Sequence, residues 1–382
     1  MLSYLWRFFS PALTALRYFG YLGYRAFGFL SHLFPLSIGY HPPQSGKLDD
    51  LEAASHPAGD DDTSTSHCET YTLQLHPQHD LKVIEIGSSF QIYEVSDDIF
   101  LKSPLLYVPP ENNASERAQQ HYASNTLSQM NQLQNERSVL QLLQNQTHPH
   151  IIEAIDTHYP EGIYLRKYHP LSEDNLPPQR QRIRWYRDLT HALCHIHSFG
   201  IVHANVRMDS ISLDDHDRVI LSDFGTASPI GAPNDVSPIN GPSPTLSEKT
   251  DIFAMGSLIY QMEHGAKLDL SVDSHGTLVL PSIHTGRPML DSIIRDAWLG
   301  GYGRTVEMLQ RIEAIDTIGD SPAQGLQSQF ISTRELRSRV REWRDGREDR
   351  FGSVLNGVVL SEDHLQSLAD RYGLDRGAGL RF

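Results

Sequence analysis

The chain has 382 residues, of which 39% are hydrophobic and 21% charged, so it is long and apolar enough to fold around a core. Asp and Glu outnumber Lys and Arg by 47 to 32, and the net charge of −15 argues against nucleic acid as a partner. The two cysteines, Cys68 and Cys194, lie far apart and match no metal-site spacing. We therefore expect reduced thiols in a reducing compartment such as the cytosol.

Residues 1–40 hold 12 of the 34 aromatic residues, together with Arg7, Arg17 and Arg25 and no acidic residue. We predict a hydrophobic, aromatic-rich anchor or targeting segment that associates with a membrane. Three interpretations stay open: a membrane-anchored or membrane-lying helix, a cleaved mitochondrial-type targeting peptide, and a helix packed on the protein's own body. A spanning helix over about 18–40 would place Arg25 centrally, at a cost of roughly 2.5–3.5 kcal/mol.

The next segment, residues 41–78, has a different composition. Between Asp49 and Glu69 the chain carries seven acidic residues and no Lys or Arg, mixed with Ser, Thr, Pro and Gly. This composition is typical of a solvated chain that cannot bury a core. We predict an acidic disordered linker over 41–78.

Three short runs of alternating apolar residues follow, at 81–86, 91–95 and 99–102. They predict consecutive strands of a small antiparallel sheet. The segment 105–130 is rich in Asn, Gln and Ser, so we expect a mobile excursion there.

A helix is predicted next, because Met130, Leu133, Leu140 and Leu143 recur at three- and seven-residue spacing. Glu136 falls on or beside the same apolar face. A carboxylate on a buried face requires a cationic partner, whereas a Glu at the edge of the apolar stripe would be partly exposed.

Further along, residues 148–152 are expected to open another strand. A second amphipathic helix is predicted over 179–199, and Gly200 is placed to end it. Paired strands are expected over 211–221.

Three motifs accompany these elements in order: His203-Ala-Asn-Val-Arg-Met-Asp-Ser210, Asp223-Phe-Gly225 and Asp251-Ile-Phe-Ala-Met-Gly256. The ordered set resembles the protein-kinase catalytic core, in a divergent form similar to the kinase-like proteins found in fungi. The resemblance covers roughly residues 81–315. It implies an α+β, two-lobed fold with a small antiparallel β-sheet lobe and a mainly α-helical large lobe, which we expect at 79–315.

The resemblance also implies ATP and Mg²⁺ as cofactors and assigns residues to them. Lys102 matches the lysine that contacts the nucleotide phosphates, and Glu136 matches the helix carboxylate that holds this lysine. Asp223 matches the aspartate that binds Mg²⁺, a hard cation that prefers anionic oxygen ligands.

The phosphate-covering loop departs from the family pattern. The family's G-x-G-x-x-G corresponds here to Ile86-Gly-Ser-Ser-Phe-Gln91, in which only Gly87 is retained. Glycine lets backbone amides approach phosphate closely, so the two losses weaken this contact. An aromatic residue near the tip of the loop, here Phe90, is common in the family.

The catalytic loop differs from the family at three positions. Asn205 stands where the family has the base Asp, and an amide cannot take a proton from a substrate hydroxyl. Ser210 replaces the metal-binding Asn and is a shorter ligand for a second Mg²⁺. Ala204 replaces an Arg that would receive a phosphorylated activation loop.

The segment 226–248 is rich in Pro, Ser and Gly, and the family's Ala-Pro-Glu position falls near Ser237-Pro-Ile239 without an acid in register. It offers little platform for a peptide substrate. We therefore predict a nucleotide-binding pseudokinase or a scaffold for a protein partner. The alternative is a weakly active Ser/Thr protein kinase that transfers the ATP γ-phosphate to a protein substrate.

A helical C-terminal extension is predicted over 316–382. Residues 333–350 mix arginines and acids at helical spacing around an apolar stripe of Leu336, Val340 and Trp343. A last helix should run from Ser361 to Gly373 by capping logic. We expect this extension to dock on the large lobe.

Three histidines, His191, His195 and His197, lie on the second predicted helix. His191 and His195 are four residues apart and could share a metal ion, but no third ligand has suitable spacing. Helix packing with solvent-facing imidazoles is the favoured interpretation, and no metal site is predicted there.

Overall fold

The computed structural model describes residues 72–78, 80–234, 241, 243–265, 271–272, 278–316, 331–356, 361–374 and 376. Leu75–Phe382 form one compact unit, and the other unit, Met1–Gln74, lies almost entirely outside the described residues. The predictions of an anchor at 1–40 and of most of the linker at 41–78 therefore fall outside them. Within the described part of the chain, no helix is long and apolar enough to cross a membrane.

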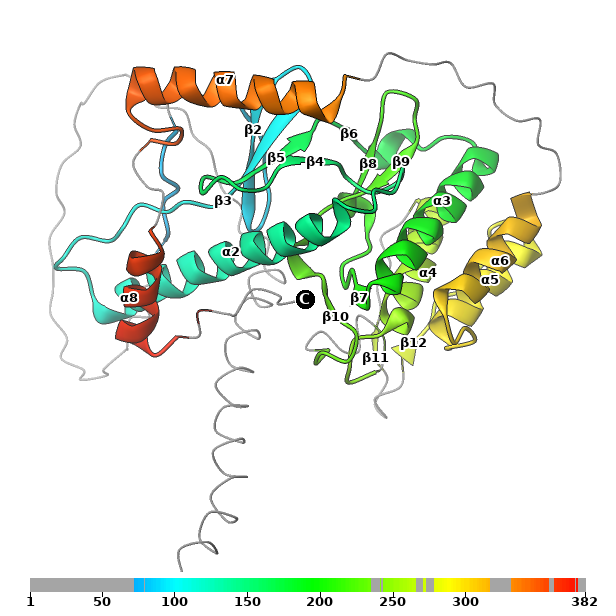
Figure 1. The fold of residues 1–382 in the computed structure, drawn as a ribbon. Coiled ribbons are helices and arrows are strands. Elements are labelled where there is room, and N and C mark those ends of the chain that lie inside the picture. Colours follow the sequence, from blue (N-terminus) through cyan, green and yellow to red (C-terminus); the bar gives the residue numbers. More distant parts are fainter. Residues whose placement is uncertain are drawn as a thin grey trace, which may run out of the picture. The chain divides into compact units, whose positions relative to one another are not determined.

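A five-stranded antiparallel sheet forms the small lobe (Figure 1). Its strand order is β1-β2-β3-β5-β4, so the three strands predicted first lie side by side as expected. The strand expected from His148 begins later, at Ala154, because Ile151 instead bridges in parallel to Leu221 of another sheet. The strands are β1 Val83–Ile86, β2 Phe90–Ser96, β3 Ile99–Pro104, β4 Ala154–Asp156 and β5 Ile163–Arg166.

The prediction of a mobile excursion over 105–130 is wrong for the second half of that segment. Helix α2, Glu116–Leu143, begins there, and the Ser115 side chain caps it by accepting from the Ala118 amide. Tyr122 and Leu127 are buried on this added length, at 4% and 1% exposure. Tertiary packing therefore orders a stretch whose composition alone suggested a loop.

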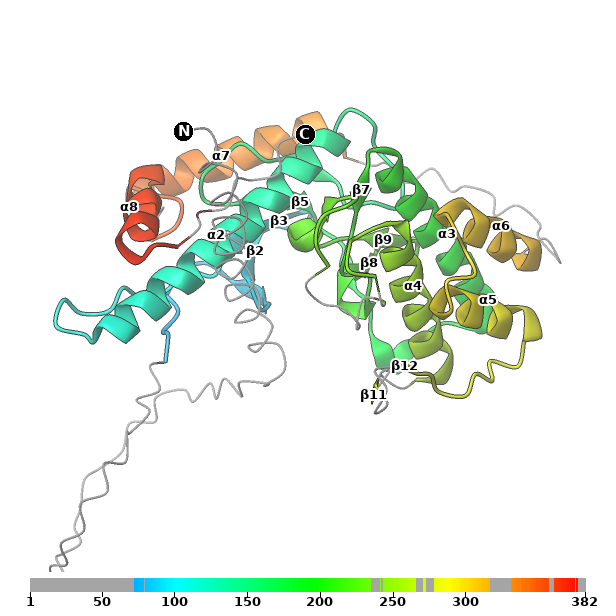
Figure 2. The same cartoon turned by 90° about the horizontal axis from the view of Figure 1, so that it is seen from below.

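The large lobe is mainly helical and carries several short strands in smaller sheets (Figures 1 and 2). The helix predicted over 179–199 is α3, and its inward face packs into the main hydrophobic core. The helices of the large lobe are α3 Gln179–Ser198, α4 Glu248–His264, α5 Pro288–Trp298 and α6 Thr305–Asp316. Its short strands are β6 His169–Pro170, β7 Ile201–Val202, β8 Ile211–Leu213, β9 Val219–Leu221, β10 Ser228–Pro229, β11 Ser271–Val272 and β12 Leu278–Val279.

Helix α7, Thr333–Phe351, corrects the expectation that the C-terminal extension docks on the large lobe. It lies along the small sheet in both views (Figures 1 and 2). Leu336 and Val340 are fully buried in one cluster with Leu101 and Tyr164 of the sheet. The predicted apolar stripe is right, and its partner is the sheet because that face is rich in large apolar side chains.

Helix α8, Glu362–Tyr372, packs on the N-terminal half of α2. Leu365 and Ala369 bury against Leu127. Ser361 caps α8 by accepting from the His364 amide, and Gly373 ends it in the left-handed conformation at φ 61°, as the capping pattern predicted.

Candidate functional site

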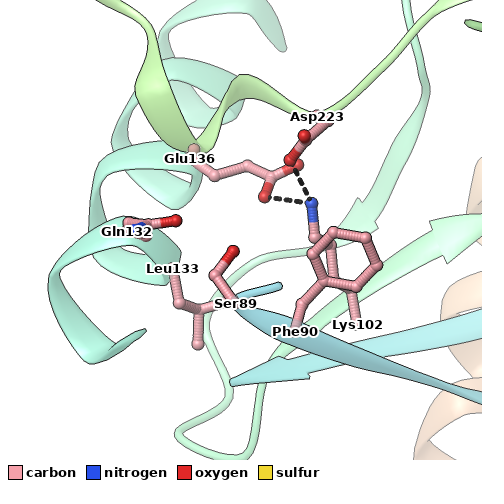
Figure 3. A pocket seen from close by; sticks show the side chains of 8 residues that line it. Ser89, Phe90, Lys102, Gln132, Leu133, Glu136 and Asp223 are labelled. Carbon is pink, nitrogen blue, oxygen red and sulfur yellow. Dashed lines mark hydrogen bonds and ion pairs between the residues drawn. The ribbon is translucent and has the colours of Figure 1, made fainter. Parts of the chain in front are cut away.

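Lys102 lies at the centre of a cluster that joins three parts of the chain (Figure 3). It sits on β3, and its ammonium Nζ is 2.6 Å from Glu136 Oε2 of α2 and 2.9 Å from Asp223 Oδ1 in the loop after β9. Lys102 and Glu136 are almost completely buried, with side-chain exposures of 6% and 2%. Opposite charges removed from water in this way stabilise each other, and loss of one would leave the remaining charges without a partner.

Glu136 is therefore a buried, paired carboxylate and not a partly exposed residue at the edge of the apolar stripe. Its second oxygen, Oε1, accepts a long hydrogen bond of 3.4 Å from the Phe224 amide. The neighbouring Asn135 donates its side-chain amide to the carbonyls of Gly225, at 3.0 Å, and Ala227, at 2.7 Å. Helix α2 is thus fastened to the Asp-Phe-Gly segment by two adjacent residues.

The charges of this cluster influence one another through space. Burial acts to lower the pKa of the Lys102 ammonium, but Asp223 and Glu136 outweigh it and raise that pKa. Burial also acts to raise the pKa of the Asp223 carboxyl, but Lys102 outweighs it and lowers that pKa. Burial dominates for Glu136, whose pKa is raised. Lys102 is therefore a permanent cation, and Asp223 keeps its negative charge.

Asp223 has the left-handed backbone conformation, at φ 64° and ψ 67°. Asp tolerates this conformation better than most residues because its short side chain can bond locally. Its other oxygen, Oδ2, lies 3.5 Å from the Asn205 side-chain amide, which donates to it. The structure therefore brings Lys102, Glu136, Asp223 and Asn205 together.

The loop that carries Asn205 is held through its backbone. Asp251 at the start of α4 accepts from the His203 amide at 2.7 Å and from the Ala204 amide at 2.9 Å. His197 Nε2 lies 2.8 Å from the same carboxylate. Burial acts to raise the pKa of Asp251, but the bond from His197 outweighs it, and the net pKa is lowered.

Asp251 and His197 are positioning residues to which the sequence pattern assigned no such role. The motif at 251–256 pointed to Asp251 without indicating its partners. The sequence groups His197 with His191 and His195, whereas in the structure His197 bonds Asp251 and, at 2.8 Å through Nδ1, Thr305. Among the described residues, no group of three His, Cys, Asp or Glu side chains could hold a metal ion.

Ser210 is fully buried, and its hydroxyl donates to the Asn205 carbonyl at 2.7 Å. This bond closes the loop and uses the Ser210 proton on the backbone. The oxygen donors fit one Mg²⁺ held through the Asp223 carboxylate, with phosphate oxygens and water completing its shell. A second metal ion would lack the Asn carboxamide that the family has at the position of Ser210.

The turn over Gly87–Phe90 covers the cluster from the small lobe. The Gly87 amide donates to the Phe90 carbonyl at 2.9 Å, and the Phe90 ring centroid lies 4.2 Å from Lys102 Nζ. Ser89, Gln132 and Leu133 complete the wall of a pocket of about 200 Å³, open solvent included. The enclosed space of this pocket has room for little more than one water molecule.

The segment 226–248 is only partly described, and the Ser237-Pro-Ile239 position lies outside the described residues. On either side of it the chain pairs with itself: the Gly231 amide donates to the Leu246 carbonyl at 2.8 Å, and the Leu246 amide to the Ala232 carbonyl at 2.7 Å. The described part of this segment is therefore a closed antiparallel turn.

A scan against models of known protein families finds no match. Comparison with curated proteins finds several kinases. Over 34% of its length the chain is 25% identical to "NUAK family SNF1-like kinase 1" of Homo sapiens and 28% identical to "Serine/threonine-protein kinase PKH3" of Eremothecium gossypii, each matched over 22% of its own length. Over 22% of its length it is 34% identical to the "Serine/threonine-protein kinase US3 homolog" of Gallid herpesvirus 2, matched over 24% of that protein.

The chain thus spans about a quarter of the length of the curated relatives it matches. These relatives are kinases from an animal, a fungus and a virus, and they agree with the ordered motifs and with the two-lobed α+β architecture. The chain is thus similar to protein kinases over the matched segments, and its two-lobed fold is protein kinase-like.

Proposed function

We propose that residues 79–315 form a nucleotide-binding pseudokinase domain that works as a scaffold for a protein partner. The observation that carries the proposal is the amide of Asn205 beside Asp223, at the position where the family has its base. An amide donates and accepts hydrogen bonds but cannot take up a proton near neutral pH. It forfeits a contribution of typically 10²- to 10⁴-fold to the rate.

Nucleotide binding is supported by the charges around Lys102. This ammonium is a buried, permanent cation that would meet phosphate oxygens, and Glu136 holds it in place. Asp223 would hold the Mg²⁺ that accompanies ATP. ATP, when bound, would supply a γ-phosphoryl group, and this chain's own contribution would be to bind and orient it.

Phosphoryl transfer is disfavoured by two further residues of the loop. Ser210 has a shorter side chain than the Asn it replaces, and its hydroxyl donates to the Asn205 carbonyl, so it would hold a second Mg²⁺ poorly. Ala204 has no cation to receive a phosphorylated segment. Losing the base, the second-metal ligand and this switch together leaves a domain suited to binding.

A weakly active Ser/Thr protein kinase is the second candidate, and the Lys102–Glu136–Asp223 cluster is the observation that favours it. Phosphoryl transfer depends mainly on positioning and electrostatic stabilisation. A chain that retains these charges could turn over slowly without its base.

The test is thermal unfolding of the full chain with ATP, with and without Mg²⁺, followed by a phosphotransfer assay on a generic protein substrate. Ligand at 100 times its Kd adds about 2.7 kcal/mol of stability. We expect a Mg²⁺-dependent rise in the midpoint that Asp223→Ala abolishes, without phosphotransfer. Lys82→Ala is the matched control, because Lys82 lies beside the same sheet with a side-chain exposure of 70%.

Either of two results would contradict the proposal. Absence of any ATP-dependent shift in the folded chain would remove nucleotide binding. Wild-type phosphotransfer that Asp223→Ala stops would favour the weakly active kinase.

We also propose that residues 1–40 hold the chain at a membrane, on the strength of their aromatic and acid-free composition alone. Cell fractionation of the full chain and of a chain lacking residues 1–40 tests this. Persistence of the shortened chain in the membrane pellet would contradict it.

A further inference from the structure

The aromatic ring of Phe90 lies beside the Lys102 ammonium, next to its two carboxylate partners (Figure 3). Two sides of the ammonium face Glu136 and Asp223 at 2.6 and 2.9 Å. The Phe90 ring lies over it with its centroid at 4.2 Å. A cation at this distance from a ring face is attracted to it, and more strongly when water is excluded.

Gly87 makes room for the ring. A Cβ atom built at Gly87 would lie 2.6 Å from Cε1 and Cζ of Phe90, far inside van der Waals contact. The ring is therefore folded beneath its own turn, against the Gly87 Cα. In this conformation the missing side chain of Gly87 leaves space for the Phe90 ring, and the ring covers the Gly87 backbone.

We propose that Phe90 is a gate that closes the nucleotide site, and that an anionic phosphate reaches Lys102 only after the ring has swung out of the cleft. The inference rests on the proposed nucleotide binding and concerns its regulation. The ring and a phosphate compete for one cation. The apparent affinity for nucleotide is therefore the intrinsic affinity multiplied by the fraction of molecules whose ring is open.

The turn itself need not unfold for the gate to open. The bonds from the Gly87 amide to the Phe90 carbonyl and from the Leu105 amide to the Ser89 carbonyl, at 2.9 and 3.3 Å, involve backbone atoms alone. Rotation about the side-chain torsions of Phe90 leaves both intact. The gate is thus one side chain on a fixed turn, and removing the ring should affect binding more than folding.

The experiment measures the Kd of Mg·ATP for the full-length wild type and for Phe90→Ala, Gly87→Ala and the double variant. We expect Phe90→Ala to tighten binding about tenfold, by removing the cost of opening. Gly87→Ala should also tighten it, because the new Cβ takes the space of the ring. In the Phe90→Ala background the same glycine substitution should no longer tighten binding. Val83→Ala, at an exposed position of β1, is the control.

Unchanged or weaker binding by Phe90→Ala would overturn the gate. A tightening by Gly87→Ala that persists in the Phe90→Ala background would do the same, because the ring would then not mediate it.

A second readout separates the gate from nucleotide binding itself. Phenylalanine fluorinated at the para position, observed by ¹⁹F NMR without nucleotide, should show a Phe90 resonance that moves in Gly87→Ala and in Lys102→Met. If no variant binds nucleotide but this resonance moves, the proposed nucleotide binding is contradicted, whereas the closed conformation of the Phe90 ring is supported. A resonance that neither substitution moves would refute the closed ring directly.

Discussion

Two regions of the candidate site, the charged cluster around Lys102 and the loop 203–210, are held in different ways. The Lys102–Glu136–Asp223 cluster consists of bonds between side chains, and each charge depends on the others. The 203–210 loop is held by bonds to its backbone, at the His203 and Ala204 amides and the Asn205 carbonyl. A side-chain cluster cannot lose a member cheaply, whereas a backbone-held loop keeps its shape when its side chains change.

This difference explains how the loop 203–210 can keep its backbone hydrogen bonds whichever side chain stands at position 205. Asp251 binds amides that every residue except proline possesses, so neither Ala204 nor Asn205 disturbs it. Removing Lys102 would instead leave the buried Glu136 carboxylate and the partly exposed Asp223 carboxylate without their cation. Four predictions test this contrast, in decreasing order of expected effect.

The largest effect concerns the loop. Asn205→Asp should raise phosphotransfer above the wild-type level by about 10²- to 10⁴-fold, because it restores a group that can accept the substrate proton. A radiolabelled-ATP assay on a generic substrate measures this, and Asn205→Leu, of similar size, is the control. A nucleotide-binding Asn205→Asp variant without any gain would show that the base is not the limiting loss.

The second effect concerns the cluster. Lys102→Met should lower the free energy of unfolding by about 3–5 kcal/mol and abolish nucleotide binding, because Glu136 and Asp223 would face each other without a cation. Denaturant unfolding measures the stability. Lys82→Met, in an exposed pair, should change it by less than about 1 kcal/mol. Equal losses in the two variants would contradict the special role of the cluster.

The third effect tests whether the helix that bears Glu136 is supported from outside the cleft. Leu365→Ala should cost about 2–3 kcal/mol, because Leu365 is buried against Leu127 of α2. Gln366→Ala, at the exposed neighbouring position, is the control. If both variants unfold at the same denaturant concentration, α8 does not stabilise α2.

The fourth and smallest effect concerns the region that makes the free energy of unfolding depend on acidic pH. Burial, together with His195, His150 and His191, lowers the pKa of His148 to about 4 from its usual 6.5. The unfolded chain therefore binds this proton first, so stability is full above about pH 6.5 and falls as the pH drops toward 4.

Between pH 7 and pH 5 the expected loss is about 1 kcal/mol, after allowance for the partial solvent exposure of His148. The lowered pKa of Asp223 keeps that residue charged over this range. Denaturant unfolding at several pH values measures the slope, which His148→Gln should flatten. An unchanged slope would assign the acid sensitivity to another region.

Sequence patterns determined much of this protein. The strands at 81–102, the helix at 179–199, the caps at Ser361 and Gly373 and the chemical identity of Lys102, Glu136, Asp223 and Asn205 were all available from them. These features depend on local periodicity, on capping and on the order of motifs. The amide at Asn205, where the resemblance would place a base, is likewise a matter of residue identity alone.

Tertiary packing decided the rest. It turned half of 105–130 into helix, where α8 packs on Leu127 and Met130. It laid α7 on the small sheet and directed the Ser210 hydroxyl to the Asn205 carbonyl. It also folded Phe90 over Lys102. Side-chain direction and helix docking depend on neighbours distant in sequence, and no local pattern encodes which of several apolar or polar partners is reached.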